Sequence, residues 1–408
     1  MAPIARQQSY PLSLPEYALK AHETSRFKAS ASGLQSLRFG FFGEVGGLLS
    51  SVKKAERDRL EYTQSEKAAE ELGDALWYLV SVATQLGIDP NELGEYGLKD
   101  LRSRFGENER TPTIPVNFRQ IDAIISSHRE GGLIQRISRM GALAHAAGTL
   151  ANASDSSLKS AAGSPTQLAH LGTLFAELAL CCASFDLRLE DVARDNLDKI
   201  RSRWPGEIFE FTPLFDPGSH YPDHEQLPRY LEMEFIERPG RGSTYVVQQL
   251  NGVFIGDPLT DNSNEPDDYR FHDVFHLAYI AYLGWSPVVR GLLKRKRKSK
   301  SSIDENEDGA RAMIIEEGIA TWIFNHAKRR DYYAGIEVGS LEYGLLKQIQ
   351  SMVQGYEVDI CPLWQWELAI LQGFKVFREL RAARNGVVVV DMTNHTLTFK
   401  AKTEENQQ

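Results

Sequence analysis

The stretch EELGDALWY, residues 70–78, combines the apolar spacing of a packed helix with two acids one turn apart. Leu72 and Leu76, together with the apolar residues that follow them, recur every three to four positions, which predicts one buried helix face. Glu71 and Asp74 stand at positions i and i+3, so their carboxylates lie on the same side of that helix. Two carboxylates in this arrangement can share a divalent cation.

Further helix signals surround this stretch over residues 13–105. Ser65 is a good N-cap for the helix that carries the acids, and proline after Asp89 is typical of a helix start. The region therefore predicts a helical bundle. The expected helices begin near Leu14, at Phe41, at Ser65 and at Pro90, and the third of them ends at Gly87.

A third acid, Glu44, lies on the helix expected over residues 41–54, among Gly43, Gly46 and Gly47. Each glycine inside a helix costs about 1 kcal/mol in propensity. Three of them beside one acid indicate a close helix approach or a phosphate neighbour. Magnesium prefers hard oxygen ligands and keeps several waters, which suits a few carboxylates together with substrate phosphates.

These segments resemble the MazG-like all-α nucleotide pyrophosphohydrolases over residues 13–105. The resemblance rests on SLPEY at 13–17, on GEVGG at 43–47 with the lysines that follow, and on EELGDALWY. In that family, acids of an E-x-x-E helix and an E-x-x-D helix hold Mg²⁺. The metal binds the triphosphate, and water attacks to release a nucleoside monophosphate and pyrophosphate. The resemblance implies that the metal ligands and catalytic residues are Glu44, Glu71 and Asp74.

The chain departs from the family pattern at Gly47, where the second acid of the first motif is expected. Lys53 and Lys54 are candidates for phosphate contacts, and the alternative is a pair of exposed lysines at a helix end. Trp77 and Tyr78 are candidates for stacking on a base, although core packing is the favoured alternative for aromatic residues.

A helical repeat is indicated farther along the chain. GLKDLRSRF at 97–105 and NLDKIRSRW at 196–204 are identical at four of nine positions, at an offset of 99. We therefore expect a module over residues 1–106, a linker over 107–132 and a degenerate second MazG-like repeat over 133–206.

The second repeat lacks the acids of the first. His170 and Thr173 stand in place of Glu71 and Asp74, and His145 falls near the position of Glu44. We expect a structural partner repeat. The alternative is a separate site made of His145, His170 and Glu177. Because MazG-like modules form symmetric assemblies, the resemblance also implies a homo-oligomer, or a bundle that the fused copy completes within one chain.

Composition changes after Trp204-Pro205, and residues 207–408 are expected to form a separate α+β domain. Short apolar runs separated by Pro-Gly and Asn-Gly turn signals predict strands. The fold class is therefore mainly α, with a duplicated bundle followed by an α+β domain. The expected strands cover 230–237, 244–250, 253–256, 387–391 and 396–399, and the expected helices cover 268–284, 308–330, 340–356 and 363–384.

His272 and His276 in this third region stand at i and i+4, a metal-ligand spacing on one helix face. Glu316 and Glu317 follow in the next expected helix, within an apolar sequence where acids are seldom buried unpaired. Two histidines and a carboxylate describe a site for a transition metal. The alternative is hydrogen bonding within a polar seam of the core. Arg270 and Arg311 would suit an anionic ligand nearby.

The run from Lys294 to Lys300 is basic, and acids follow it directly. A solvated loop is favoured over a nucleic-acid patch, and the net charge of −9 provides no global attraction to nucleic acid. Three cysteines without paired spacing indicate reduced thiols. The absence of an apolar leader or an eighteen-residue apolar run favours a cytoplasmic protein.

Two functions are expected from these patterns. The first is Mg²⁺-dependent hydrolysis of a nucleoside triphosphate to a monophosphate and pyrophosphate. The alternative is a nucleotide-sensing module with an impaired site, coupled to a metal-dependent C-terminal effector domain.

Overall fold

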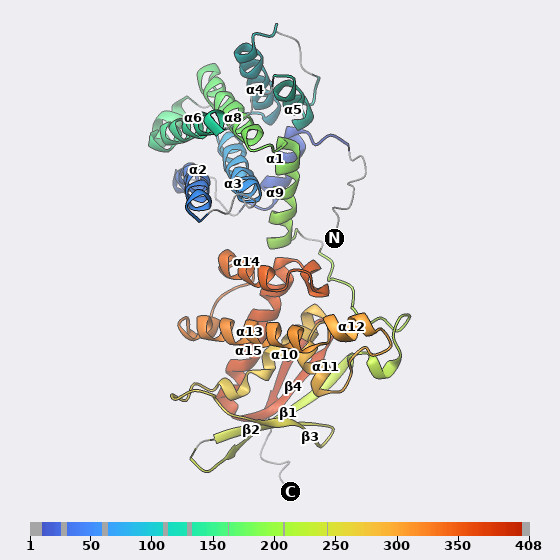
Figure 1. Ribbon diagram of the computed structural model, residues 1–408. Coiled ribbons are helices and arrows are strands. Elements are labelled where there is room, and N and C mark those ends of the chain that lie inside the picture. The colour runs from blue at the N-terminus through green and yellow to red at the C-terminus, as the bar shows by residue number, and fades with distance from the viewer. Residues whose placement is uncertain are drawn as a thin grey trace. The chain divides into compact units, whose positions relative to one another are not determined.

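The computed structural model describes residues 10–25, 31–58, 64–108, 113–128, 133–161, 163–206, 209–242 and 244–401. The chain divides into two compact units, residues 1–201 and 202–408. The first is helical, and the second combines helices with one antiparallel sheet (Figure 1). The expectation of a mainly α chain with short strands toward the C-terminus is confirmed.

The first unit is a bundle of long helices, several of which begin and end at the residues that local signals predict. Asp89 caps one helix by accepting hydrogen bonds from the amides of Asn91 and Glu92, and Gly106 ends it with φ +68°. The elements are α1 (Leu14–Glu23), α2 (Ala31–Asp58), α3 (Gln64–Gln85), α4 (Pro90–Phe105), α5 (Phe118–Ser127), α6 (Leu133–Asn152), α7 (Asp155–Ser160), α8 (Pro165–Ser184) and α9 (Leu189–Arg203).

The predicted linker at 107–132 is wrong in part, because it contains α5. Phe118, Ile121 and Ile125 are buried, so one face of this helix belongs to the core. The helix begins with a capping box of Asn117 and Gln120, a local signal that the sequence analysis overlooked. Part of the same segment, residues 109–112 and 129–132, lies outside the described residues.

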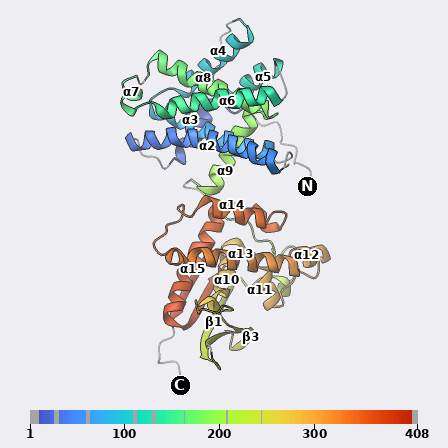
Figure 2. The same ribbon diagram turned by 60° about the vertical axis from the view of Figure 1, so that its left-hand side comes forward.

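Long helices recur in the same order in both halves of this unit. α2, α3 and α4 are followed by α6, α8 and α9, and α3 and α8 end 99 residues apart. In Figure 2, α2, α6 and α8 lie near one another, and α6 packs against both α2 and α8. α8 is long and apolar enough to cross a membrane, but 67% of its apolar window is buried, so it serves as a core helix.

The second unit is built on a five-stranded antiparallel sheet in the order β3-β2-β1-β4-β5. Leu231, Met233 and Phe235 alternate along the central strand and are buried. This face of the sheet is covered by α10 and α15. The strands are β1 (Tyr230–Pro239), β2 (Thr244–Leu250), β3 (Val253–Leu259), β4 (Asn385–Asp391) and β5 (Thr396–Ala401).

The main helices of the second unit fall where the apolar patterns predict them. One correction concerns the loop expected over 294–308, which contains the short helix α12 (Ser301–Asn306). The other helices are α10 (Asp273–Leu283), α11 (Pro287–Leu292), α13 (Ala310–Lys328), α14 (Tyr343–Met352) and α15 (Leu363–Ala383), with a 3₁₀ turn, η3 (Tyr269–Phe271), before α10.

Candidate functional site

Helices α2 and α3 form an antiparallel seam that carries the three acids of the first unit. Gly40 on α2 lies against the ring of Tyr78, and Gly47 lies against the carboxylate of Glu71. This register places Glu44 near Glu71 and Asp74 of α3, and the pKa of Glu44 responds to the charges of both. The three acids are half-buried.

Two of these acids share a proton. The Glu44 carboxyl donates a hydrogen bond to the Glu71 carboxylate. Burial, followed by the charges of Asp74 and Glu71, raises the pKa of Glu44 to about 8. Burial also raises the pKa of Glu71, and the charges of Glu70 and Asp74 add to that effect. The seam therefore holds more carboxyl groups than its surroundings neutralise.

Helix α9 of the second repeat contributes directly to this cluster. The Lys199 ammonium forms an ion pair with Asp74 and lies 3.5 Å from Glu70. The Asn196 amide donates to Asp74 over 2.9 Å and accepts a 2.8 Å hydrogen bond from the buried Tyr17 hydroxyl. Helix α9 thus orients and partly neutralises the acids of α3.

Gly47 is not a vacant ligand position. A Cβ built there would overlap the carboxylate of Glu71, so that carboxylate fills the space in which an acid side chain was expected. Gly43 and Gly46 have open space around them instead. The acid expected from the family pattern is absent from α2, and Glu71 of α3 lies in its place.

Of the four predicted substrate-binding residues, only Tyr78 lies beside the acids. Tyr78 is half-buried beside the acids. This burial, together with the charges of Glu44 and Asp74, raises the pKa of Tyr78. Trp77 is buried in the core face of α3 and packs edge-on against Tyr78, with ring centroids 5.1 Å apart. Lys53 and Lys54 are exposed two to three turns beyond Glu44, away from the acids along the helix.

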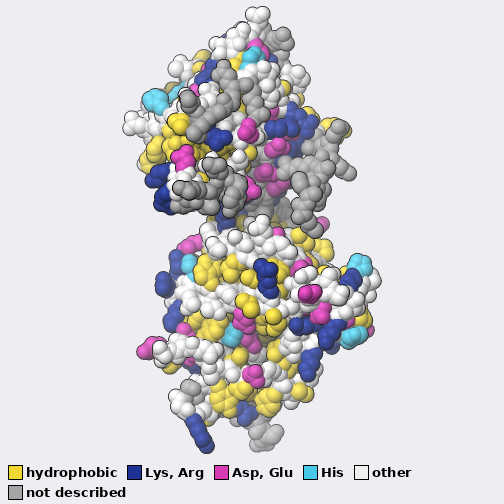
Figure 3. All heavy atoms as spheres, viewed as in Figure 1, with side chains coloured by type: hydrophobic (Ala, Val, Ile, Leu, Met, Phe, Trp, Pro, Cys, Tyr) yellow, Lys and Arg dark blue, Asp and Glu magenta, His cyan; other side chains and the backbone are white. Residues whose placement is uncertain are grey.

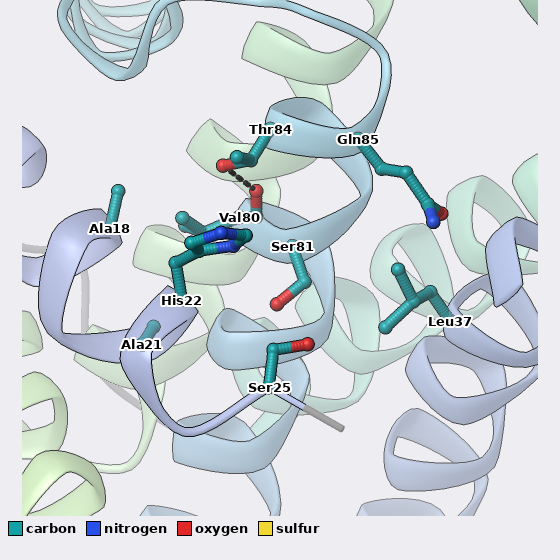
Figure 4. A pocket seen from close by; sticks show the side chains of 9 residues that line it. All are labelled: Ala18, Ala21, His22, Ser25, Leu37, Val80, Ser81, Thr84 and Gln85. Carbon is teal, nitrogen blue, oxygen red and sulfur yellow. Dashed lines mark hydrogen bonds between the residues drawn. The ribbon is translucent and has the colours of Figure 1, made fainter. Parts of the chain in front are cut away.

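A cavity of about 220 Å³ opens on the same α2–α3 seam, on the opposite side of Tyr78 from Asp74. Leu37 and Ser81 lie one turn beyond the Gly40–Tyr78 contact, on α2 and α3. Figure 4 shows the His22 ring and the Ser25 side chain approaching from α1 and the residues after it. The remaining lining residues are Ala18, Ala21, Val80, Thr84 and Gln85.

The histidines of the second repeat do not assemble into a site. His145 is exposed on α6 and His170 is half-buried on α8, where burial lowers its pKa. Glu177 instead forms an ion pair with Arg104 of α4. The alternative of a His145–His170–Glu177 cluster is therefore wrong, because the acid is bound elsewhere.

His272 and His276 in the second unit converge with Glu317. Among the described residues, these three form the group whose nitrogen or carboxylate donors all lie within 4.8 Å of one another. The Oε2 atom of Glu317 is 3.5 Å from Nε2 of His276 and 3.7 Å from Nε2 of His272. The acids around Glu44 do not meet this distance within the described part of the chain, and Lys199 lies among them.

Glu316 does not point at this group directly. It is fully buried and accepts hydrogen bonds from Nδ1 of His276 (2.8 Å), the Ser286 hydroxyl (2.6 Å) and the Val288 amide (2.8 Å). Burial opposes a charge on His276, but Glu316 and Glu317 outweigh it and hold the pKa of His276 well above its ordinary value. Figure 3 shows acid and histidine side chains at several separate places on the visible face of this unit.

The arginines expected near an anionic ligand have other roles. Arg270 is buried and paired with Glu237, Asp261 and Asp268. Arg311 is exposed. The seven-residue basic run is not a uniformly solvated loop either, since Arg297 is fully buried between Asp308 and Glu357.

Four further polar residues lie beside the clusters without having been predicted: Asn196, Lys199 and Tyr17 at the first, and Asp273 at the second. The Oδ1 atom of Asp273 is 3.2 Å from Nε2 of His272. Asn196 and Lys199 stand at i and i+3 in the very segment that revealed the repeat. Polar residues at that spacing were a usable signal, which a search restricted to acids ignored.

Two comparisons with known proteins found similarities, and one of them is located in the second unit. Residues 210–403 match the family model of the MazG C-terminal domain, which supports a MazG-related family for this chain. The chain is also similar to the Gene 37 protein of Mycobacterium phage L5, with 29% identity over 96 residues, covering 22% of this chain and 84% of the phage protein. No solved structure matches the chain.

Proposed function

We propose that this chain, whose C-terminal region is MazG-related, is a nucleoside triphosphate pyrophosphohydrolase with its active site on the α2–α3 seam. The reaction adds water to the α-phosphorus and breaks its bond to the oxygen that bridges to the β-phosphorus. The products are a nucleoside monophosphate and pyrophosphate. The family match supports nucleotide pyrophosphatase chemistry in general, and the residues of the seam support the finer assignment.

The observation that carries the proposal is the convergence of Glu44, Glu71 and Asp74 where α2 packs against α3, and the raised pKa of Glu44 accords with it. Glu44, Glu71 and Asp74 present only oxygen donors, and their mutual repulsion is relieved in this structure by a shared proton and by Lys199. A divalent cation with oxygen preference would relieve the same repulsion. The donor set therefore fits Mg²⁺.

When bound, Mg²⁺ neutralises phosphate charge and makes a bound water more acidic. Glu44, Glu71 and Asp74 would hold the ion. A carboxylate of this cluster that is left free of the ion would accept the proton of the attacking water, and Glu71 is a candidate because burial raises its pKa. When a metal ion binds Asp74, the Lys199 ammonium can leave that carboxylate and form an ion pair with a substrate phosphate instead.

The cavity beside Tyr78 is the proposed place for the nucleoside. Asp74, Tyr78 and Ser81 lie on one face of α3, and seven residues of helix separate the first from the last by about 10 Å. A nucleotide bound along this face would reach from the acids to the cavity. The Tyr78 ring would lie against its middle.

The test is pyrophosphate release from a panel of nucleoside triphosphates, with and without Mg²⁺. Asp74→Asn and Glu71→Gln should each lower turnover at least about 100-fold, equivalent to about 2.7 kcal/mol of barrier. Glu66→Gln is the matched control, because Glu66 is an exposed acid on the first turn of the same helix. Unchanged turnover in a folded Asp74→Asn protein would refute the site.

The second candidate is a nucleotide sensor, and the ion pair between Lys199 and Asp74 favours it. A lysine can stabilise such a cluster without any metal, and then the seam binds nucleotide without cleaving it. Calorimetry separates the two functions. Stoichiometric nucleotide binding, with no pyrophosphate released in Mg²⁺, would support the sensor over the enzyme.

A further inference from the structure

We propose that His272, His276 and Glu317 bind one zinc ion in the second unit, with an open coordination position toward solvent. This site is separate from the acids of the α2–α3 seam and does not rest on the proposed pyrophosphohydrolase function.

The hydrogen bonds of Glu316 fix the orientation of His276. Oε1 of Glu316 accepts from Nδ1 of His276 and from the Ser286 hydroxyl. Ser286 Oγ itself accepts from the Val289 amide, so its own proton points to Glu316. Glu316 is therefore an acceptor throughout, and Nδ1 of His276 carries a proton.

The other ring nitrogen of His276 is the exceptional atom. Nε2 is buried and has no hydrogen-bond partner among the described residues. Buried polar atoms are rarely left in this state, because the lost hydration costs about 1–3 kcal/mol. A metal ion bound at Nε2 satisfies it, and a carboxylate on the far nitrogen of a ligating histidine is the usual second-shell arrangement.

His272 is held in the same tautomer by a different group. Its Nδ1 lies 2.9 Å from the Tyr269 carbonyl, which can only accept, so this nitrogen carries the proton. The Tyr269 ring stacks on the imidazole at 4.2 Å with an angle of 3°, which fixes the ring plane. With the proton on Nδ1, Nε2 of the neutral ring presents its lone pair.

Carboxylate oxygens face the Nε2 atoms of both histidines. Glu317 Oε2 lies within 3.7 Å of both Nε2 atoms, and Asp273 Oδ1 lies 3.2 Å from that of His272. Gln248 donates to the other oxygen of Asp273 and holds the carboxylate in place. A cation bound between these nitrogen and oxygen atoms would neutralise the converging carboxylates.

The chemistry of the ligands selects the metal. Imidazole is a borderline donor that magnesium seldom accepts, whereas two histidines and one carboxylate are a known zinc set with a fourth position for water. The histidines are buried but the Glu317 side chain is 43% exposed, so the fourth position opens to solvent. A zinc-bound water there has the form of a catalytic site.

The experiment measures zinc bound to the full-length protein after treatment with a chelator. A chromophoric competitor reports affinity, and metal content is read after gel filtration. We expect one zinc per chain and no comparable retention of Mg²⁺. Glu317→Gln should abolish retention, and because Glu317 is partly exposed the variant should fold. Glu316→Gln should weaken binding about 10- to 100-fold through the orientation of His276.

His224→Gln is the matched control, since His224 is a largely exposed histidine of the same unit. It should bind zinc as the wild type does. Co²⁺ in place of zinc should give the visible absorption bands of four- or five-coordinate cobalt, and His276→Ala should lose them. A wild-type protein that retains no zinc, or a Glu317→Gln variant with unchanged affinity, would overturn the proposal. Pyrophosphate release is unaffected by Glu317→Gln in either case, so failure here is distinct from failure of the first site.

Discussion

The side-chain amide of Asn196 donates a 2.9 Å hydrogen bond to the carboxylate of Asp74, across 122 residues of sequence. Asn196 lies on α9, the last helix of the second repeat, and Asp74 lies on α3 of the first. Gly73 permits this approach, since a Cβ there would be 3.1 Å from that of Asn196. Helix α9, which carries none of the three acids, therefore supports the acids of α2 and α3.

Asn196→Ala should weaken both the fold and the site. The change removes a donor from Asp74 and leaves the buried Tyr17 hydroxyl without its acceptor, which costs about 1–3 kcal/mol. Urea unfolding should show that loss, and pyrophosphate release should fall because Asp74 is less well oriented. Asp198→Ala, an exposed change on the same helix, is the control and should alter neither quantity. A stable, fully active Asn196→Ala protein would contradict the role assigned to α9.

Gly47→Ala should reduce activity although it favours the helix. Alanine improves helix propensity by about 1 kcal/mol, but its methyl group would displace the Glu71 carboxylate. Because that carboxylate is the end of a flexible side chain, the fold should survive while turnover falls. Gly46→Ala is the matched control, with open space around the new methyl group. It should stabilise the helix and leave turnover unchanged. Equal turnover in both variants would contradict the position of the Glu71 carboxylate against Gly47.

Mg²⁺ binding to the first unit should strengthen as pH rises toward 8. The pKa of Glu44 is raised from 4.5 to about 8, so between these values the folded protein holds a proton that the unfolded chain has released. Stability without metal therefore falls as pH rises through this window. Bound Mg²⁺ must displace the proton, so its affinity should increase by up to about tenfold per pH unit. The charged or titratable groups facing Glu44 are Glu70, Glu71, Asp74, Tyr78 and Lys199.

Calorimetric titration with Mg²⁺ at a series of pH values checks this expectation. Glu44→Gln should bind Mg²⁺ more weakly at pH 8 and lose most of the slope. Glu66→Gln should keep the wild-type slope, because Glu66 is exposed away from the cluster. A slope that persists in Glu44→Gln would assign the displaced proton to another group.

Local signals predicted much of the fold. Asp89 and Gly106 mark the ends of α4 in the sequence as in the structure, because a cap and a left-handed glycine depend on neighbouring residues alone. The start of α2 was placed ten residues late. Residues 31–40 contain two glycines and two serines, so propensity disfavours a helix there. Packing overrides it, with Leu34 and Leu37 buried and Gly40 against Tyr78.

The candidate sites were predictable in their residues but not in their partners. The acids of α3 and the histidine pair of α10 follow from helical spacing, which sequence displays directly. The different roles of Glu316 and Glu317 do not follow from this spacing. Neighbouring residues of a helix point about 100° apart, and only packing decides which of the two faces the Nε2 atoms of the histidines. Lys199 likewise reaches Asp74 across 125 residues, a contact that no local pattern encodes.

The basic run provides the last prediction, because its central residue is structural. Arg297 is buried, donates to Asp308 and Glu357, and is held by partners 11 and 60 residues away. Its neighbour Arg290 pairs with Asp216 in the same buried network. Removing one member of such a network leaves an opposite charge buried and unpaired, which costs about 3–5 kcal/mol.

Arg297→Met keeps most of the side-chain volume and deletes the charge, so the second unit should lose about that much free energy of unfolding. Lys298→Met removes one positive charge from the same run at an exposed position, so it should change stability by less than about 0.5 kcal/mol. Denaturant unfolding of both variants gives the comparison. If the run served mainly to bind nucleic acid, both variants would keep wild-type stability and both would lose affinity for a duplex. The buried position of Arg297 predicts the opposite, with a large loss of stability in one variant and none in the other.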